Sequence, residues 1–180
     1  MTQISDNIQL IKVTIKDQKK LMDLAWKIYP TEYKYLWKND DCNWYLNRCY
    51  GLKNFTDELA ENLAHYYFVI YKTQIEGFIR FVFNKSLELF PDKSATYLHR
   101  IYLSQESQGT GISQKLMNWI EQKSKEKGMD YIWLEAMSSK DRALQFYKKN
   151  SFEILNKRQL YFELLQDNYR GIYIMYKPIK

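Results

Sequence analysis

The spacing of apolar residues alternates between a period of two and a period near 3.6, which predicts strands and helices in turn. Residues 8–15 (IQLIKVTI) alternate as a strand does. Residues 19–29 carry apolar side chains at helical spacing, and Pro30 is expected to end that helix because proline lacks a backbone donor. Residues 40–64 are mixed and acidic, which predicts helix with a break near Gly51.

The middle of the chain predicts a β-hairpin followed by a third strand. Residues 66–71 and 75–83 alternate, and 72–74 supply a short turn between them. The third strand is predicted at Ala95–Leu103. It leads through the polar sequence QESQGTGIS into an amphipathic helix that is expected to close at Gly128.

The last third of the chain completes a mixed pattern. Residues 131–136 (YIWLEA) form a continuous apolar run, typical of a strand buried on both faces. Ser138 and Asp141 form a capping-box pattern ahead of a short helix, and residues 152–163 and 171–176 predict two final strands. No linker or repeat divides the 180 residues, so we expect a single α/β domain over 1–180.

Composition narrows the classes of function. The chain is 46% hydrophobic, enough to bury a core without disulfides or metal. Its net charge of +6 is spread along the sequence and mixed with 21 acidic residues, so we expect no nucleic-acid partner. No apolar run approaches the roughly 18 residues of a membrane span, and the first residues lack a signal-peptide layout. We therefore expect a cytoplasmic protein that makes no contact with membranes.

Metal and disulfide chemistry have few candidate residues. Cys42 and Cys49 are the only cysteines, and His65 and His99 are the only histidines. They are too few and too scattered for a usual zinc site. We expect two free thiols and no metal.

The sequence QGTGIS between a predicted strand and a predicted helix is the most informative stretch. Gly109 and Gly111 can adopt backbone angles closed to other residues, so successive N–H groups can face one concavity at the helix N-terminus. Such a nest binds phosphate, and Lys115 one turn later adds a positive charge. The dinucleotide fingerprint lacks its third glycine here, and the P-loop lacks its Gly-Lys-Ser/Thr.

This stretch resembles the signature of the GNAT superfamily of N-acetyltransferases, in which a strand ending in an Ile-Tyr-Val-like triplet leads to Gln/Arg-x-x-Gly-x-Gly/Ala at the head of a helix. The matching residues are Ile101, Tyr102, Leu103, Gln108, Gly111 and Ser113. A second landmark, Ala-x-x-Phe-Tyr-x-x-x-Gly-Phe, is matched by Ala143, Phe146, Tyr147 and Phe152. The segments IYL, WLEA and ALQFYKKNSF look most like the bacterial spermidine/spermine (polyamine) N-acetyltransferase branch.

Three positions depart from the pattern of that family. Ser113 stands where Gly or Ala is usual, and its backbone N–H can still face a phosphate. Lys140 stands where relatives often carry an Asn that contacts the cofactor, so that contact becomes electrostatic. Ser151 replaces the usual Gly, and Asn150 is expected to take the left-handed cap of the helix instead.

The resemblance implies a fold and a co-substrate. The GNAT fold is a mostly antiparallel sheet of about seven strands flanked by about four helices, splayed between Ala95–Leu103 and residues 131–136. Acetyl-CoA would lie along the edge of the strand that ends at Leu103, where a bulge frees an N–H for the thioester carbonyl. The residues implied to bind it are Ile101, Tyr102, Leu103, Gln108, Gly109, Thr110, Gly111, Ile112, Ser113 and Lys140.

Two residues are candidates for proton transfer. The resemblance places the Tyr147 hydroxyl beside the cofactor sulfur as an acid, although a core aromatic is the alternative. His99 occupies a strand position where close relatives often carry Glu, and an imidazole suits a base, whereas the alternative is a hydrogen-bonded strand histidine. Neither cysteine lies near a motif, which favours direct attack by the amine in a ternary complex over a covalent acetyl-enzyme.

The resemblance places the acceptor pocket between the first helices and the last strands. Carboxylates there suit a small polyamine or lie on solvated helix faces: Glu32, Asp40, Asp41, Asp57, Glu58, Glu61 and Glu135. Aromatic residues there form the wall of a pocket or pack on the sheet: Tyr33, Tyr35, Trp37 and Trp44. Acetylation of a protein or peptide, and a non-catalytic module that binds acetyl-CoA, are the alternatives. Many GNAT domains are dimers, so a homodimer is left open.

Overall fold

An eight-stranded sheet forms the centre of the molecule. The computed structural model describes residues 1–180 and orders the strands β1-β2-β3-β4-β5-β6-β8-β7. Only β5 and β6 are parallel, and all other neighbours are antiparallel. The strands are β1 (Thr2–Ser5), β2 (Ile8–Lys12), β3 (Ala64–Tyr71), β4 (Gln74–Phe83), β5 (Ala95–Leu103), β6 (Tyr131–Met137), β7 (Glu153–Gln159) and β8 (Gly171–Pro178).

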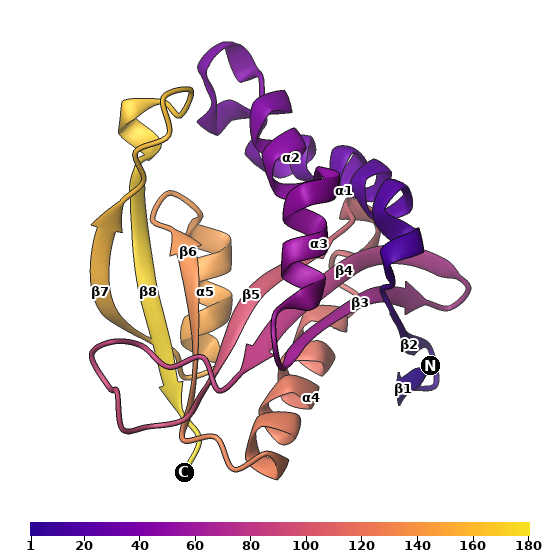
Figure 1. Cartoon of the computed structure of the whole chain (residues 1–180), viewed down its shortest axis with the longest axis vertical. Coiled ribbons are helices and arrows are strands. Elements are labelled where there is room, and N and C mark those ends of the chain that lie inside the picture. The colour runs from indigo at the N-terminus through magenta and orange to yellow at the C-terminus, as the bar shows by residue number, and fades with distance from the viewer.

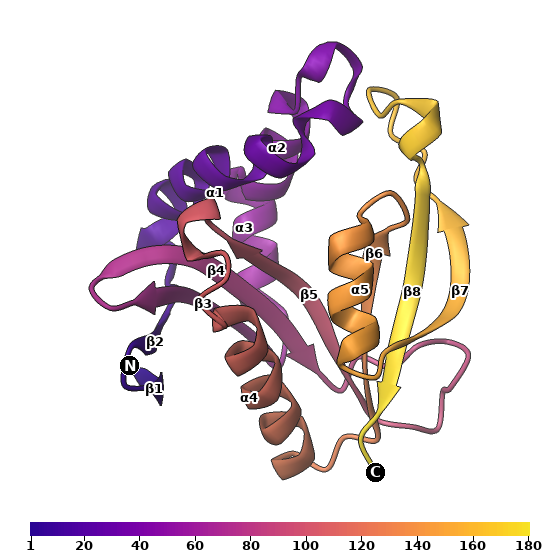
Figure 2. The same ribbon diagram turned by 180° about the vertical axis from the view of Figure 1, so that it is seen from behind.

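Five α-helices cover the two faces of this sheet, three on one side and two on the other (Figures 1 and 2). The first face is covered by α1 (Gln18–Tyr33), α2 (Asn43–Tyr50) and α3 (Leu52–Ala60). The other face is covered by α4 (Ile112–Glu126) and α5 (Asp141–Lys149). This is the mixed α/β architecture expected from the sequence. It has eight strands and five α-helices, where about seven strands and about four helices were predicted.

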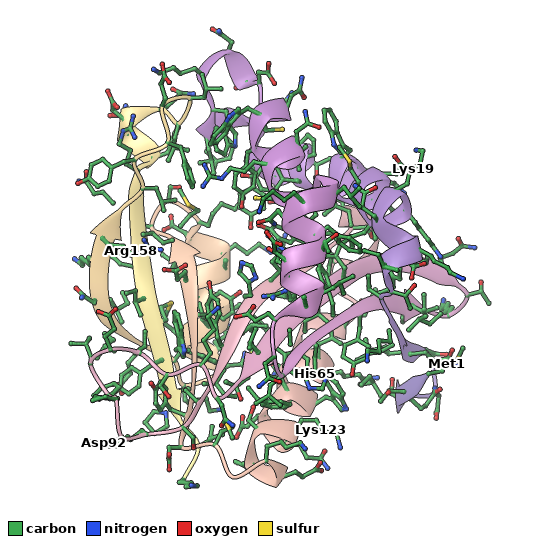
Figure 3. The ribbon with its side chains drawn as sticks, in the orientation of Figure 1. Met1, Lys19, His65, Asp92, Lys123 and Arg158 are labelled. Atoms are coloured by element: carbon green, nitrogen blue, oxygen red, sulfur yellow. The ribbon has the colours of Figure 1, made fainter.

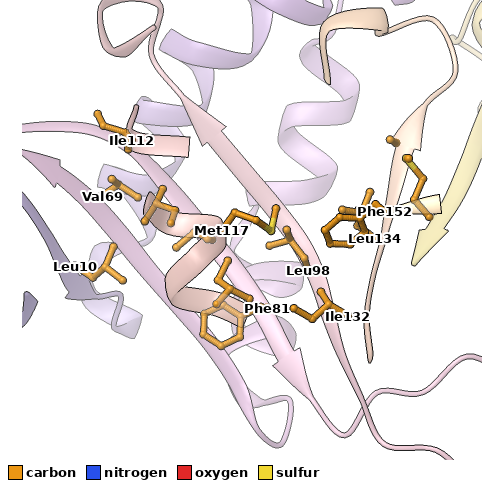
Figure 4. Close-up of a cluster of buried hydrophobic side chains, with 14 of the residues drawn as sticks. Leu10, Val69, Phe81, Leu98, Ile112, Met117, Ile132, Leu134 and Phe152 are labelled. Carbon is orange, nitrogen blue, oxygen red and sulfur yellow. The ribbon is translucent and has the colours of Figure 1, made fainter. Parts of the chain in front are cut away.

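Each face has its own apolar core, because successive strand residues point to opposite sides. On the α4 and α5 face, Leu116 and Met117 of α4 pack against Phe81, Leu98 and other strand residues (Figure 4). On the opposite face, the three N-terminal helices pack against a second cluster centred on β3 and β4. No helix in the structure is both long enough and apolar enough to span a bilayer.

Most predicted elements are confirmed, including the hairpin of β3 and β4 and the break at Gly51. The prediction that Pro30 ends the first helix is wrong, since α1 continues to Tyr33. Burial of Tyr29 and the stacking of its ring on that of Tyr33, with centroids 4.7 Å apart, favour the extra turn despite the missing donor. The strand predicted over residues 8–15 is β2, and it ends at Lys12, earlier than expected.

Three local predictions around β1 and α5 need correction. The hairpin partner β1 was not expected. Ser138 does not cap α5, because its hydroxyl donates to the Gly171 carbonyl oxygen at 3.0 Å. Ser151 itself takes the left-handed conformation, with φ of 64°, while Asn150 keeps a φ of −90° and its side chain bonds to Gln114.

The sheet opens where β5 and β6 diverge, as predicted. The two parallel strands pair only between Ala95–Leu98 and Tyr131–Leu134, and beyond this they separate (Figure 2). A register shift against β4 leaves His99 as an extra residue in β5, so the predicted bulge is present. Because of the bulge, Leu98 faces the α4 core while both His99 and Arg100 line the cavity on the opposite side.

Candidate active site

Three cavities follow the line where β5 and β6 separate. The loop cavity, about 280 Å³, lies between the end of β5, the QGTGIS loop and α5. The aromatic cavity, about 430 Å³, lies between the helices α1 to α3 and the strands β5 to β8. A passage of about 90 Å³ shares Ile101 and Tyr147 with the loop cavity, and His99 and Glu135 with the aromatic cavity. The passage therefore lies between the two larger cavities.

Unpaired backbone donors form one wall of the loop cavity. Gly109 and Gly111 have φ of 75° and 77°, which glycine tolerates and other residues rarely adopt. The N–H groups of Gly109, Gly111, Ile112 and Ser113 make no hydrogen bond within the chain, and all four residues line the cavity. A Cβ added at either glycine would meet no atom within 4 Å, so the side-chain positions of both glycines face open space. This is the nest predicted from the sequence, and it fits a pyrophosphate.

Side chains add charge to the same cavity. Lys140 binds both the Glu32 carboxylate and the Glu32 carbonyl oxygen at 2.9 Å. Burial alone would raise the pKa of Glu32, but the hydrogen bond and charge of Lys140 lower it. Arg142 donates to the Gln108 side-chain oxygen at 2.5 Å and has no acidic partner. Lys115 is exposed and lies outside the cavity lining, where it bonds the Ser5 hydroxyl at 3.3 Å.

The structure gathers nearly all of the predicted cofactor residues. Those that line the loop cavity are Ile101, Tyr102, Leu103, Gln108, Gly109, Gly111, Ile112, Ser113 and Lys140. Thr110 does not, because its hydroxyl donates back to the Ser107 carbonyl oxygen at 2.5 Å. Arg142 was missed by sequence reasoning, although a basic residue in the first turn of the Phe-Tyr helix is a signal that could have found it.

Tyr147 lies where the loop cavity meets the passage. Its ring packs against Phe146 and Phe152, and its hydroxyl makes no hydrogen bond within the chain. Burial, and then the neighbouring Tyr33, raise the pKa of this phenol above its ordinary value. The hydroxyl therefore carries its proton throughout the neutral range, as an acid must.

His99 is part of a buried network of charges on the other side of the sheet. Its Nδ1 lies 2.7 Å from Nη1 of Arg80, whose guanidinium is fully buried and bonds to Glu61 and to the Glu58 carbonyl oxygen. Since a guanidinium only donates, Nδ1 accepts and Nε2 carries the proton. Burial and the charges of Arg100, Arg80 and Lys85 lower the pKa of His99 to about 2. The imidazole is thus a neutral hydrogen-bond donor.

The aromatic cavity is lined mainly by hydrophobic side chains, many of them aromatic, and its few acidic groups are paired. Its lining rings are Tyr29, Tyr33, Trp37, Tyr45, Tyr97, Tyr102 and Phe162. Of the predicted acceptor carboxylates only Glu58 and Glu135 line it, and they pair with Arg100 and Arg158. Glu32 lies in the loop cavity instead, while Asp40, Asp41, Asp57 and Glu61 lie outside both cavities. Tyr35 and Trp44 lie beside the lining and contact Tyr169 and Trp37.

Neither cysteine forms a disulfide. The wall of the aromatic cavity does include Cys49, closer to the site than its place in the sequence suggested, but Cys49 does not line the passage. Burial raises the pKa of this thiol, which disfavours the reactive thiolate.

Hydrogen bonds close the aromatic cavity at its outer end. The segment after α1 pairs with the segment between β7 and β8 through Lys38 N–H to Leu164 and Gln166 N–H to Leu36, both at 2.9 Å. The Gln166 side chain adds bonds to the Tyr35 and Trp37 carbonyl oxygens. These contacts join the two halves of the molecule above the opening in the sheet, and we call them the bridge.

Comparisons with known proteins agree with this geometry. Residues 19–152 match the acetyltransferase (GNAT) family model, so the chain belongs to that family. It is similar to PaiA N-acetyltransferase from Thermoplasma acidophilum in complex with coenzyme A, with a TM-score of 0.72, 19% identity, and coverage of 95% of this chain and 98% of that one. Arabidopsis thaliana Naa50, in complex with the bisubstrate analogue CoA-Ac-MVNAL, gives a TM-score of 0.67, 21% identity, and coverage of 95% and 98%. The spermidine/spermine N-acetyltransferase SpeG of Vibrio cholerae gives a TM-score of 0.64 and 14% identity, with coverage of 97% of this chain and 95% of that one.

The protein is accordingly an N-acetyltransferase that uses acetyl-CoA as its acetyl donor. The residues of the loop cavity fit that donor, because unpaired N–H groups and Arg142, which has no acidic partner, line the space that a pyrophosphate needs. When bound, acetyl-CoA supplies the acetyl group as an activated thioester.

Proposed function

We propose that this enzyme acetylates a small primary amine directly, with the donor in the loop cavity and the acceptor in the aromatic cavity. The observation that carries the proposal is the passage, which shares walls with both cavities at the opening between β5 and β6. An amine that enters from one side can meet a thioester held on the other. Holding the two together supplies most of the rate gain in such a reaction.

Two residues at the passage are proposed to handle protons. Tyr147 keeps its proton at neutral pH, so its free hydroxyl can protonate the departing thiolate. An alkylammonium, with a pKa of about 10.4, must also lose a proton. Glu135 is the only carboxylate that lines the passage, and it already pairs with Arg158. We propose that it binds the ammonium beside this arginine and accepts the proton through water. His99, the base suggested by the sequence, is proposed to donate a hydrogen bond instead.

The bridge favours a small acceptor over a protein surface. Two main-chain hydrogen bonds and the Gln166 amide close the outer end of the cavity. A folded protein loop that entered between the segment after α1 and the segment between β7 and β8 would have to break them. An extended peptide N-terminus remains the second candidate. Its support is the similarity to Naa50, whose structure holds a peptide-like bisubstrate analogue.

The polyamine acceptor suggested by the sequence has a weaker basis. Its support is the similarity to SpeG and the acidic residues of the N-terminal helices. The two carboxylates that line the cavity, however, are both neutralised by arginine. A polycation carries several ammonium groups, and beyond the one that reaches Glu135 at the passage the others would find no unpaired carboxylate in the cavity wall.

The experiment is release of free thiol from acetyl-CoA by the purified protein, alone and with spermidine, a lysine peptide, a peptide with a free N-terminus and simple aromatic amines. Amine-dependent release by a small molecule supports the proposal. Thiol release with the peptides and with no small amine would favour the second candidate, a peptide acceptor. Tight binding of coenzyme A without release for any amine would contradict it.

A further inference from the structure

The wall of the aromatic cavity carries more positive than negative charge. The ionisable side chains that line it are Arg48, Arg100, Arg158, Glu58 and Glu135, which gives 3 − 2 = +1 with histidine neutral. Arg100 binds Glu58, and Arg158, which is labelled on β7 in Figure 3, binds Glu135. The remaining positive charge therefore belongs to Arg48.

Arg48 has no acidic partner. It lies on α2, exposed to solvent, and forms no salt bridge or side-chain hydrogen bond in the structure. The guanidinium instead lies over the rings of Trp44 and Phe162, 5.3 Å from each centroid. Trp44 belongs to α2 and Phe162 to the segment after β7, so the Arg48 guanidinium is in contact with two different elements. All of its N–H donors stay available to a ligand.

Several aromatic faces of the cavity are also already in contact with cations of the chain. Lys140 lies 4.7 Å from the centroid of Tyr33, and Lys85 lies 5.4 Å from that of Tyr97. Phe162 is in contact with Arg48. An ammonium that sought a cation–π contact would compete with these groups and be repelled by them. The cavity therefore offers donors and positive potential rather than a cage for a polycation.

We propose that the acceptor is a small amine that also bears an anionic group, a carboxylate, sulfonate or phosphate on an apolar or aromatic body, and that Arg48 binds this group. The amine end would reach Glu135 at the passage, so the cavity would recognise a zwitterion with its two charges at opposite ends. This inference rests on the proposed function, since it specifies the acceptor of the same site.

A matched pair of acceptors tests the charge alone. The primary amine of 4-(aminomethyl)benzoate matches that of 4-methylbenzylamine, and only the first compound carries a carboxylate. We expect the wild-type kcat/KM to be about tenfold higher for 4-(aminomethyl)benzoate, because only this compound can make a charge-assisted hydrogen bond to Arg48. Arg48→Ala should abolish this preference through KM with little change in kcat for 4-methylbenzylamine, and Arg48→Lys should retain part of it.

Lys38→Ala is the control, because it removes the exposed positive charge of a bridge residue but keeps its main-chain hydrogen bond to Leu164 and leaves the cavity wall unaltered. It should keep the preference. Equal kcat/KM for the pair in wild type, a preference for spermidine, or an unchanged preference in Arg48→Ala would each overturn the inference while leaving the acetyltransferase proposal standing.

A binding measurement decides the inference even if turnover fails for every acceptor. Both members of the pair are titrated calorimetrically into protein saturated with coenzyme A. Tighter binding of the benzoate that is lost in Arg48→Ala supports the anion site. Absence of benzoate binding, or equal binding of the two compounds, overturns it.

Discussion

The two larger cavities of this enzyme are built in different ways. The loop cavity uses backbone N–H groups at the start of α4, supplied by one continuous stretch of sequence. The aromatic cavity uses side chains from α1, α2, β5, β6 and the last strands, brought together only by the fold. A site made of backbone donors tolerates changes of side chain, whereas a site made of side chains changes its ligand whenever one of them changes. A site of this design can therefore keep its acetyl donor while side-chain changes alter its acceptor.

The largest effect is expected from a change within the backbone nest. Gly111→Glu places a carboxylate beside the pyrophosphate and strains a left-handed position. We expect affinity for coenzyme A to fall roughly a thousandfold, about 4 kcal/mol, by calorimetry. Gly128→Glu is the control, since Gly128 has φ of 74°, equally open surroundings and no place in the cavity. Similar losses in both variants would mean that strain, not the nest, is responsible.

A smaller effect is expected at the passage. Tyr147→Phe removes the one hydroxyl proposed to protonate the leaving thiolate, so kcat should fall by about 100-fold. Affinity for coenzyme A should change less than about twofold, because the ring contacts remain. Stopped-flow or steady-state thiol release measures the first quantity and calorimetry the second. Tyr67→Phe on β3, remote from the cavities, is the control. An unchanged kcat would show that the thiolate leaves unassisted.

The two cations of the loop cavity should contribute unequally. Arg142 has no acidic partner, so Arg142→Ala should weaken binding of coenzyme A by about tenfold, and less at high salt. Lys140→Met should weaken it by about twofold, because Lys140 is already neutralised by Glu32. Equilibrium titrations at two salt concentrations compare the variants. The reverse order would contradict the charge assignment made from the structure.

The buried histidine beside the aromatic cavity should affect the pH dependence of stability. The pKa of His99 is lowered to about 2 in the fold and is about 6.5 when unfolded, so below pH 6.5 the unfolded chain binds the extra proton. Its contribution to stability is complete above pH 6.5 and is lost as pH falls. Between pH 7 and 5 we expect a loss of about 1–2 kcal/mol from this residue in urea unfolding. His99→Gln should reduce that loss, and an identical pH dependence would contradict the burial of a neutral imidazole.

The sequence alone predicts the phosphate nest, because its residues are neighbours along the chain. Two glycines before an amphipathic helix, after an alternating strand, predict the phosphate nest because its donors are backbone groups at fixed spacing. The strands and helices were predictable for a similar reason, since each has its own apolar period. Pro30 was the exception, because packing beyond the proline favours a helix turn that the local rule excludes.

The aromatic cavity could not be predicted in the same way. Glu58 and Glu135 suggested an acidic pocket in the sequence, but their partners Arg100 and Arg158 lie 42 and 23 residues away along the chain. The role of His99 changed for the same reason, since Arg80 on the neighbouring strand fixes its tautomer. Pairing between distant residues decides which charges remain free, and it follows from how α3 packs on the sheet and how the strands are ordered in it.

Donor and acceptor are proposed to meet at the passage, where the acetyl group moves from one to the other without a covalent enzyme intermediate. Initial rates of thiol release, measured over a grid of acetyl-CoA and acceptor concentrations, test this transfer. Direct transfer requires both substrates on the enzyme together, so double-reciprocal lines should intersect. Parallel lines, with acetylation of the enzyme in the absence of any amine, would contradict the account and point to a covalent intermediate.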